Sequence, residues 1–285
     1  MISLKKSQVM DLIRRTLSED LAGFGDITSK YLLPSDHHSQ AYIWCKQDMA
    51  VLCGINIAGW LMEEVDSSIK LKMLKKDGDM VSRHQKVATL SGPTASLLAA
   101  ERSALNFIQH LSGIATITKK FSNIASAQGV KIVDTRKTKP NLRLVEKYAV
   151  ETGGGYNHRF GLFDGIMLKD NHIRAAGGII EAVKAIKGSI PHPLKIEVEV
   201  QDSSQLQQAI TAQADIIMLD NMNPDQIEES VKKIRSETNK NTLIEVSGNI
   251  TLNNLEDYCN TGIDLISTGY ITHSAPAADF SMEFI

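Results

Sequence analysis

Five cationic or cationisable side chains fall in three short segments of the chain, each beside an apolar run. They are Arg136, Lys137, His158, Arg159 and Lys169. A planar guanidinium binds a carboxylate or phosphate through two hydrogen bonds, whereas a lysine ammonium acts as a point charge. The cluster therefore predicts a binding site for a small anion that carries carboxylates, phosphates or both.

The positive charge is local, since the 285-residue chain has a net charge of -2. Residues 131–174 contain nine Lys or Arg against five Asp or Glu. A basic pocket in a nearly neutral protein favours a small-molecule site over a nucleic-acid surface. Neighbouring residues of an extended strand point to opposite sides. Only one of Arg136 and Lys137 should therefore face the ligand unless the backbone turns there.

Carboxylates complete the candidate chemistry. Glu199 and Asp220 end two later apolar runs and offer the oxygen ligands that Mg²⁺ prefers. We predict Mg²⁺ as the cofactor, held by these two residues directly or through the substrate. Glu197 lies two residues before Glu199 and would point the same way from a strand, at a different depth. The sequence leaves open which of the two faces the ligand and which pairs with a cation such as Lys169.

Glycine-containing turns supply a further candidate site. Ser247, Gly248 and Asn249 follow one apolar run, and Thr268 and Gly269 follow the next. In α/β barrels the loops after the last strands often bind phosphate through backbone amides, and glycine allows close approach. These turns are predicted to bind a phosphate.

Six short apolar runs predict the strands that position these residues. They cover residues 130–133, 165–168, 194–198, 216–219, 243–246 and 263–266. Helix-like segments separate them, which is typical of βα units and a parallel sheet. Each run ends in polar residues or glycine, and in an α/β barrel that C-terminal rim carries the active site. A barrel is therefore expected from residue 112 onward.

A strand-rich region precedes residue 112. The spacing of apolar residues predicts a helix from Val9 to Leu21, another at 54–65 and a long helix that Thr94 caps. Alternating segments predict strands at 40–45, 50–54, 69–74 and 86–91, with turns at 77–79 and at Gly92–Pro93.

Composition limits the class of protein. The 42% hydrophobic content suffices for a full core, and 285 residues fit one large barrel or two domains. Cys45, Cys53 and Cys259 are odd in number and lack a metal-binding spacing, so free buried thiols are expected. Charges near the N-terminus and the lack of a long apolar run argue against a signal peptide and a membrane span. The expected location is the cytoplasm.

Together with further short motifs, these residues make the chain resemble the quinolinate phosphoribosyltransferases along nearly its whole length. The matching stretches are Glu19–Asp20, Gly25–Thr28, Glu101–Arg102, Leu105–Asn106, Leu111–Thr116, Asp134–Thr138, Glu146–Val150, Gly153–Arg159, Leu168–His172, Glu197–Val200, Leu219–Asn221 and Thr272–Ser274. They span nearly the whole chain in the same order as in the family, which makes the resemblance more specific than one motif.

The resemblance implies a fold, an activity and an assembly. The fold is an N-terminal α/β sandwich, expected at residues 1–111, and a C-terminal α/β barrel, expected at 112–271, with the tail 272–285 packed back on the sandwich. The activity transfers phosphoribose from phosphoribosyl pyrophosphate to quinolinate, with loss of CO2, to give nicotinate mononucleotide for NAD biosynthesis. The assembly is a homodimer in which each subunit completes the other's site.

The resemblance also implies roles for single residues. Arg102 is the arginine contributed by the neighbouring subunit, and the quinolinate cluster comprises Arg136, His158, Arg159 and Lys169. Lys137 matches a lysine near both substrates, and Thr135 is a further substrate-binding residue. Glu199 and Asp220 contact the ribose hydroxyls and Mg²⁺ and act in catalysis with Lys137. The 5′-phosphate loops are formed by Ser247, Gly248, Asn249, Thr268 and Gly269.

Two departures from the family pattern and three alternatives stay open. Asn249 and Asn141 stand where the family usually has glycine. The alternatives are a related transferase with another acceptor, such as the proteins found alongside molybdate transport, a Schiff-base aldolase using Lys169 or Lys137, and a phosphosugar-sensing barrel. An aldolase lysine needs an apolar environment, whereas these lysines lie among acids.

Overall fold

The structure is a computed structural model that describes residues 4–238 and 242–285. The chain divides into two compact units, neither of which is continuous in sequence. The first contains the residues up to 119, with 139–154 and 274–285, and the second contains 120–138 and 155–273.

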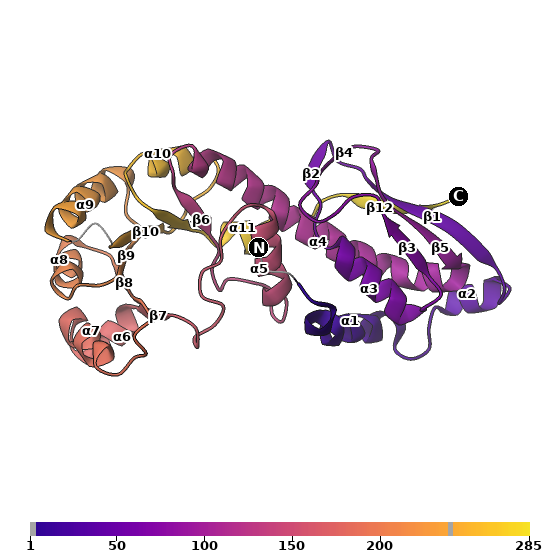
Figure 1. The fold of residues 1–285 in the computed structure, drawn as a ribbon, viewed down its shortest axis with the longest axis horizontal. Coiled ribbons are helices and arrows are strands. Elements are labelled where there is room, and N and C mark those ends of the chain that lie inside the picture. The colour runs from indigo at the N-terminus through magenta and orange to yellow at the C-terminus, as the bar shows by residue number, and fades with distance from the viewer. Residues whose placement is uncertain (1–3, 239–241) are drawn as a thin grey trace. The chain divides into compact units, whose positions relative to one another are not determined.

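An antiparallel sheet forms the centre of the first unit, in the strand order β12–β1–β5–β3 (Figure 1). Its strands are β1 (His38–Cys45), β3 (Lys70–Met73), β5 (Lys86–Pro93) and β12 (Phe280–Phe284). A separate pair consists of β2 (Met49–Val51) and β4 (Met80–Ser82). The helices are α1 (Lys6–Leu21), α2 (Ile27–Leu32), α3 (Ile55–Val65), α5 (Arg143–Thr152) and α4 (Thr94–Ser126), which continues past residue 112 into the second unit.

Local sequence explains these elements. Val9, Ile13 and Leu17 recur every four residues and are the buried residues of α1, as expected for an amphipathic helix. Along β1, residues 41, 43 and 45 are buried while the residues between them are partly exposed, so burial alternates from one face of the sheet to the other.

A six-stranded parallel sheet forms the second unit, in the order β6–β11–β10–β9–β8–β7. Its strands are β6 (Lys131–Val133), β7 (Ile166–Leu168), β8 (Ile196–Val200), β9 (Ile216–Asp220), β10 (Leu243–Ser247) and β11 (Leu265–Ser267). Helices α6 (Asp170–Ala176), α7 (Ile179–Lys187), α8 (Ser203–Thr211), α9 (Pro224–Glu237), α10 (Leu255–Cys259) and α11 (Tyr270–His273) complete it. Figure 1 shows α6 to α9 along the outer side of the curved sheet.

The strand order is that of a barrel left open between β6 and β7. From β7 to β11 each strand pairs with the next in sequence, and β6 then joins β11. The connection from β6 to β7 contains α5, which belongs to the first unit. Every residue of β8 is buried, as expected for a parallel strand covered on both faces.

The six strands predicted after residue 112 are confirmed, as are the helix from Val9 to Leu21, the helix at 54–65 and the long helix that begins at Thr94. The predicted class of an α/β protein with a parallel sheet is also confirmed. Cys45, Cys53 and Cys259 are free and buried. Within the described residues, none of the helices has the length and apolar character needed to cross a membrane.

Two local predictions are wrong, and two strands were not predicted. The strand predicted at 50–54 ends at Val51, because Gly54 adopts φ +96° and begins α3. Gly92–Pro93 is not a turn but the end of β5, which leads directly into α4. Strands β4 and β12 were not predicted, since each is short and finds its partner far away in sequence.

Candidate functional site

A cavity of about 330 Å³ lies at the C-terminal ends of the strands of the second unit. Its lining comprises Thr135, Arg136, Lys137, His158, Arg159, Met167, Lys169, Glu199, Met218, Asp220, Asn221, Ser247 and Ser267. The predicted cations and acids therefore meet at one rim, although they come from different strands.

Arg136 and Lys137 both line the cavity because the chain turns directly after β6. The Lys137 amide donates a hydrogen bond to Thr135 Oγ1 (3.0 Å), and the Thr138 amide donates to the Arg136 carbonyl (2.9 Å). Thr272 supports the turn, since its hydroxyl donates to the Lys137 carbonyl (2.8 Å). The backbone turn that the sequence required for both cations to face one ligand is thus present.

His158 and Arg159 are positioned by a segment that runs beside β6. The Tyr156 amide donates to the Ile132 carbonyl (2.8 Å), and the Asp134 amide donates to the Tyr156 carbonyl (3.1 Å). The buried Asp134 carboxylate then accepts a hydrogen bond from the His158 amide (2.8 Å). These bonds bring the segment that follows Gly153–Gly155 to the end of β6.

The Arg159 guanidinium is held in place before any ligand binds. It donates to the Gly165 carbonyl (3.0 Å) and contacts Met167 Sδ (3.6 Å). Burial, and then the charge of Arg136, lower the pKa of Arg159. Two arginines that repel each other at one cavity favour an anion there, because an anion relieves the repulsion.

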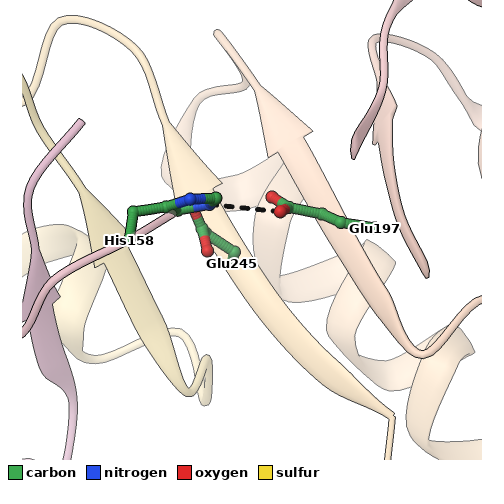
Figure 2. Close-up of side chains that lie close together, drawn as sticks. All are labelled: His158, Glu197 and Glu245. Atoms are coloured by element: carbon green, nitrogen blue, oxygen red, sulfur yellow. Dashed lines mark ion pairs between the residues drawn. The ribbon is translucent and has the colours of Figure 1, made fainter. Parts of the chain in front are cut away.

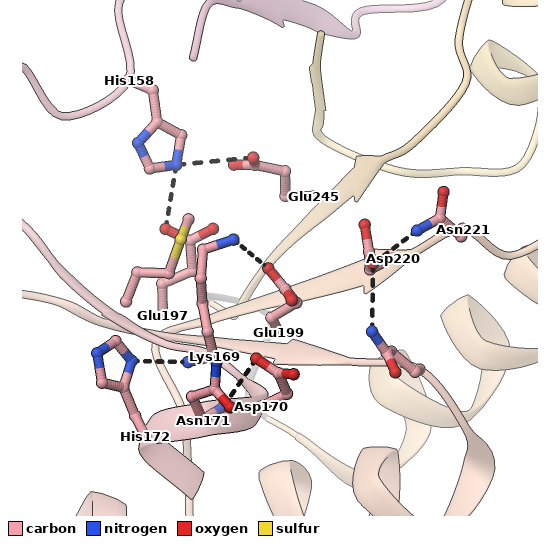
Figure 3. A network of polar contacts seen from close by, with 12 residues as sticks. His158, Lys169, Asp170, Asn171, His172, Glu197, Glu199, Asp220, Asn221 and Glu245 are labelled. Carbon is pink, nitrogen blue, oxygen red and sulfur yellow. Dashed lines mark hydrogen bonds and ion pairs between the residues drawn. The ribbon is translucent and has the colours of Figure 1, made fainter. Parts of the chain in front are cut away.

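The acids at the rim are bonded to protein groups, one to a cation and one to neutral amides (Figure 3). Lys169 Nζ lies 2.5 Å from Glu199 Oε2. Asp220 accepts hydrogen bonds from the side-chain amides of Asn221 (2.7 Å) and Gln201 (3.4 Å). Lys169 therefore pairs with Glu199, the carboxylate that lines the cavity, and not with the deeper Glu197.

Mg²⁺ at Glu199 and Asp220 stays a prediction that the donor set can accommodate. Both side chains present carboxylate oxygens to the cavity from neighbouring strands, but each is already bonded to a protein group. Mg²⁺ often retains waters and uses one or two carboxylates together with substrate phosphates. The residues present thus fit an ion shared with a substrate better than one enclosed by protein.

The predicted phosphate turns follow β10 and β11. Ser247 lines the cavity, and Gly248 packs so closely on Asn221 that a Cβ would lie 2.2 Å from Asn221 Oδ1. Asn249 has φ +51°, a left-handed conformation that asparagine tolerates better than most residues. A Cβ on Gly269 would lie 2.9 Å from Lys137 Cδ, and the Thr268 amide donates to the Val133 carbonyl (3.1 Å).

The partly buried His158 meets the buried Glu197 and Glu245 in a cluster beneath this rim (Figure 2). His158 Nε2 is 3.1 Å from Glu197 Oε2 and 3.7 Å from Glu245 Oε1. His158 Nδ1 accepts a hydrogen bond from the Arg159 amide (2.7 Å). These two contacts assign the proton of a neutral His158 to Nε2, which donates to Glu197.

Burial and charge act together on this cluster. Burial opposes protonation of His158, but the hydrogen bond to Glu197 and the charges of Glu197 and Asp134 are among the causes that outweigh it and raise the pKa of His158. The Arg159 amide, by contrast, favours an unprotonated Nδ1. Burial, followed by the charge of Glu197, raises the pKa of Glu245 to about 7.

Most of the predicted site residues lie together in the second unit, but Arg102 is exposed on α4 in the first. The sequence interpretation missed the lining residues Met167, Met218, Asn221 and Ser267, and it missed Glu245. Strand alternation could have indicated Glu245, since it lies two residues before Ser247 on the same face of β10.

Comparison with known proteins places this geometry in a family. The model described as the quinolinate phosphoribosyl transferase N-terminal domain matches residues 26–112, and that of the C-terminal domain matches 114–283. The chain belongs to the quinolinate phosphoribosyl transferase family. The family recognised from the sequence motifs is thereby confirmed.

Relatives and solved structures of this family match almost the whole chain. A probable nicotinate-nucleotide pyrophosphorylase [carboxylating] of Bacillus subtilis is 44% identical over 276 residues, which are 97% of this chain and 93% of the relative. A tobacco protein named quinolinate phosphoribosyltransferase [decarboxylating] 2b, mitochondrial, is 39% identical and covers 96% of this chain and 81% of its own length. The crystal structure of NadC from Streptococcus pyogenes superposes with a TM-score of 0.93, at 38% identity over 100% of both chains.

Proposed function

We propose that this chain is a decarboxylating quinolinate phosphoribosyltransferase that serves de novo NAD biosynthesis. It transfers phosphoribose from phosphoribosyl pyrophosphate to the ring nitrogen of quinolinate and releases pyrophosphate, CO2 and nicotinate mononucleotide. The observation that carries the proposal is the single cavity rim where Arg136, Lys137, Arg159 and Lys169 meet Glu199 and Asp220. Membership of the family supports the same reaction.

Quinolinate suits the cationic side of the cavity because it carries two carboxylates on adjacent ring carbons. Arg136 and Arg159 can each bind a carboxylate through two hydrogen bonds. Lys169 adds a third positive charge, and its ammonium group is held in position by the ion pair with Glu199. His158 lines the same cavity, and its role in binding quinolinate stays a prediction; its Nδ1 is bonded to the Arg159 amide and its Nε2 to Glu197.

Phosphoribosyl pyrophosphate suits the part of the cavity formed by the carboxylates and by the turns after β10 and β11. Ser247, Gly248, Asn249, Thr268 and Gly269 form turns whose backbone amides can hold the 5′-phosphate, and Glu199 and Asp220 can bind the ribose hydroxyls. Positive charge develops on the ribose ring as the bond to pyrophosphate breaks, and these two carboxylates would stabilise it. Lys137, with Thr135 beside it, is placed to stabilise the departing pyrophosphate. Bound Mg²⁺ would supply further positive charge for that leaving group.

Loss of CO2 follows from the first step. Once the ring nitrogen is bonded to ribose it is cationic, so it stabilises the electron pair left on the adjacent carbon when the carboxylate departs. That carbon then takes up a proton. The chemistry needs no covalent bond to the protein, and the ion pair of Lys169 with Glu199 is unlike the apolar environment of a Schiff-base lysine.

The assembly and location also remain proposals. We infer a homodimer in which the exposed Arg102 of each subunit completes the partner's site, on the basis of the family resemblance. The cytoplasm is the proposed location.

The decisive test is a stopped assay of the purified protein with quinolinate, phosphoribosyl pyrophosphate and Mg²⁺, with nicotinate as a parallel acceptor. Nicotinate mononucleotide from quinolinate alone is the expected result. No product from quinolinate, with phosphoribosyl pyrophosphate still bound, would point to a transferase with another acceptor. Borohydride trapping of an added carbonyl compound would point to an aldolase, and binding without turnover to a phosphosugar sensor.

A further inference from the structure

We propose that Glu245 is a proton-carrying positioning residue: it stays a neutral carboxylic acid beneath the cavity, and its ionisation weakens binding of the dianionic acceptor. The inference rests on the proposed function, since it uses the two negative charges of quinolinate. It concerns a residue that neither lines the acceptor cavity nor touches a substrate in the proposed reaction.

Glu245 is unusual for its layer of the barrel. The residues two positions before the rim residues of β7 to β11 are Met167, Glu197, Met218, Glu245 and Leu265. Such interior layers are usually filled by apolar side chains, and the methionines and leucine conform. A buried carboxylate is costly unless it is paired or protonated, so the two acids require an explanation.

The distances distinguish the two acids. The His158 Nε2–H lies within hydrogen-bond distance of Glu197 at 3.1 Å, whereas Glu245 at 3.7 Å is too far. Both Glu197 Oε1 and Glu245 Oε1 are buried without a hydrogen-bond partner. One N–H serves one carboxylate, and Figure 2 shows it directed at Glu197. Glu245 lacks that donor, and although a hydrogen bond with Ser267 favours its ionised form, burial outweighs it, so Glu245 is the member that holds the proton.

Charge balance supports this assignment. The charged or titratable groups facing Glu245 are Glu197 from β8, His158 from the segment after Tyr156, and Lys169 after β7. Asp134, after β6, faces His158. If Glu245 were also ionised beside a neutral His158, three buried carboxylates would lie under a site for a dianion, and Lys169 is already paired with Glu199. One proton on Glu245 lowers that repulsion.

A metal ion is the alternative occupant, because the ligand atoms of His158, Glu197 and Glu245 lie within 4.8 Å of one another. The protonation of His158 at Nε2 makes a metal ion unfavourable here. Since Nδ1 accepts the Arg159 amide, Nε2 carries the hydrogen and has no lone pair for a metal.

A second cavity gives Glu245 a route for proton exchange that avoids the substrate. This cavity of about 450 Å³ is lined by Glu197 and Glu245 and also by residues such as Lys131, Tyr156 and Lys195. It shares His158 and Arg159 with the acceptor cavity. Glu245 can therefore follow the pH of the solvent while the acceptor cavity is filled.

Calorimetric binding of benzene-1,2-dicarboxylate tests the proposal. This dianion lacks the ring nitrogen, so it cannot react, and titrations at pH 6 to 9 in buffers of different ionisation enthalpy count the protons taken up. In the wild type, affinity should fall by up to roughly ten-fold per pH unit above neutrality, with uptake of up to about one proton per site. In Glu245→Gln both the fall and the uptake should largely disappear, and unchanged behaviour would overturn the proposal.

A second substitution of Glu245 and a control variant make the result interpretable. Glu245→Met should reproduce the loss of proton uptake if Glu245→Gln fails to fold, because methionine already occupies this layer at two positions. Asp77→Asn is the matched control: burial raises the pKa of Asp77 too, but it lies in the first unit, bonded to Tyr148. That variant should keep the wild-type proton uptake.

The outcomes separate this inference from the proposed function. A wild type that neither binds the dicarboxylate nor forms nicotinate mononucleotide would refute the proposed function. A wild type that does both, with the same proton uptake in Glu245→Gln, would refute the inference alone. Stoichiometric Mn²⁺ or Zn²⁺ retained by the wild type and lost by Glu245→Gln would also overturn it, in favour of a metal.

Discussion

Two arginines line the same cavity, and their proximity is the main functional feature at the scale of residues. Lys169 is paired with Glu199, and Asp220 is bonded to amides. Arg136 and Arg159 both line the cavity, where burial and then the charge of Arg136 lower the pKa of Arg159, so an anion bound there is favoured. Selectivity for a dicarboxylate should therefore depend most on these two arginines.

Removing either guanidinium should affect one substrate more than the other. Arg136→Ala or Arg159→Ala should raise the KM for quinolinate by about ten- to one-hundred-fold, because charge-assisted hydrogen bonds contribute about 1.5–3 kcal/mol. The KM for phosphoribosyl pyrophosphate should change less. Steady-state kinetics with each substrate varied in turn measures both, and equal losses would contradict the acceptor assignment. Lys232→Ala, which removes an exposed cation of α9, is the control.

Glu245 should also make stability depend on pH. Its pKa is about 7 in the folded protein against an ordinary 4.5, so the folded state retains a proton that the unfolded state loses as pH rises. Folding stability should then decrease between about pH 4.5 and 7, by up to about 3 kcal/mol. The Tm of Glu245→Gln should therefore rise relative to the wild type between pH 5 and 8 in scanning calorimetry. A constant difference in Tm would contradict a raised pKa.

At the scale of elements, the ends of the parallel strands decide the chemistry. β8, β9 and β10 are neighbours in the sheet, and each delivers a polar residue to the cavity at its last or penultimate position. The turns that follow these strands are tightly packed, as the contact of Gly248 with Asn221 shows. Adding even one atom to a residue of these turns should therefore weaken phosphate binding.

Gly248→Ala should disturb this turn in two ways that a control can separate. Its φ of +106° is unfavourable for alanine, and the new Cβ would lie 2.2 Å from Asn221 Oδ1. Gly177→Ala imposes a positive φ of +87° in open space, so it should cost only about 1–2 kcal/mol of backbone strain. Gly248→Ala should lose more stability and also raise the KM for phosphoribosyl pyrophosphate, as thermal unfolding and kinetics would measure. Equal effects of the two variants would contradict close packing at the turn.

At the scale of the whole molecule, the proposed dimer makes a prediction about mixed subunits. Assayed at a quinolinate concentration below the wild-type KM, Arg102→Ala and Arg136→Ala proteins should each retain only a small part of wild-type activity if the partner's Arg102 completes the site. Co-expressed with different tags, the mixture should regain about a quarter of wild-type activity, because about half of the dimers are mixed and each mixed dimer has one intact site of two; mixed dimers purified through both tags should show about half. Activity of affinity-purified mixed dimers is the measurement. No recovery would contradict completion of the site by the partner.

The sequence determined the features that local pattern controls. Strands buried on both faces are continuous apolar runs, so all six strands of the second unit could be predicted, and the cations at their ends indicated an anion site. The ordered motifs identified the family. The short strands β4 and β12 escaped prediction, since their stability comes from partners distant in the chain.

Tertiary structure alone decided how these residues pair. The turn that directs both Arg136 and Lys137 into the cavity depends on Thr272, which lies far along the chain. Nothing local indicates that Lys169 pairs with Glu199, or that Glu245 shares a buried cluster with Glu197 and His158. Those contacts exist only because the curved sheet brings β8 and β10 and the segment beside β6 together. Burial and protonation depend on such neighbours, which residue type and spacing along the sequence do not specify.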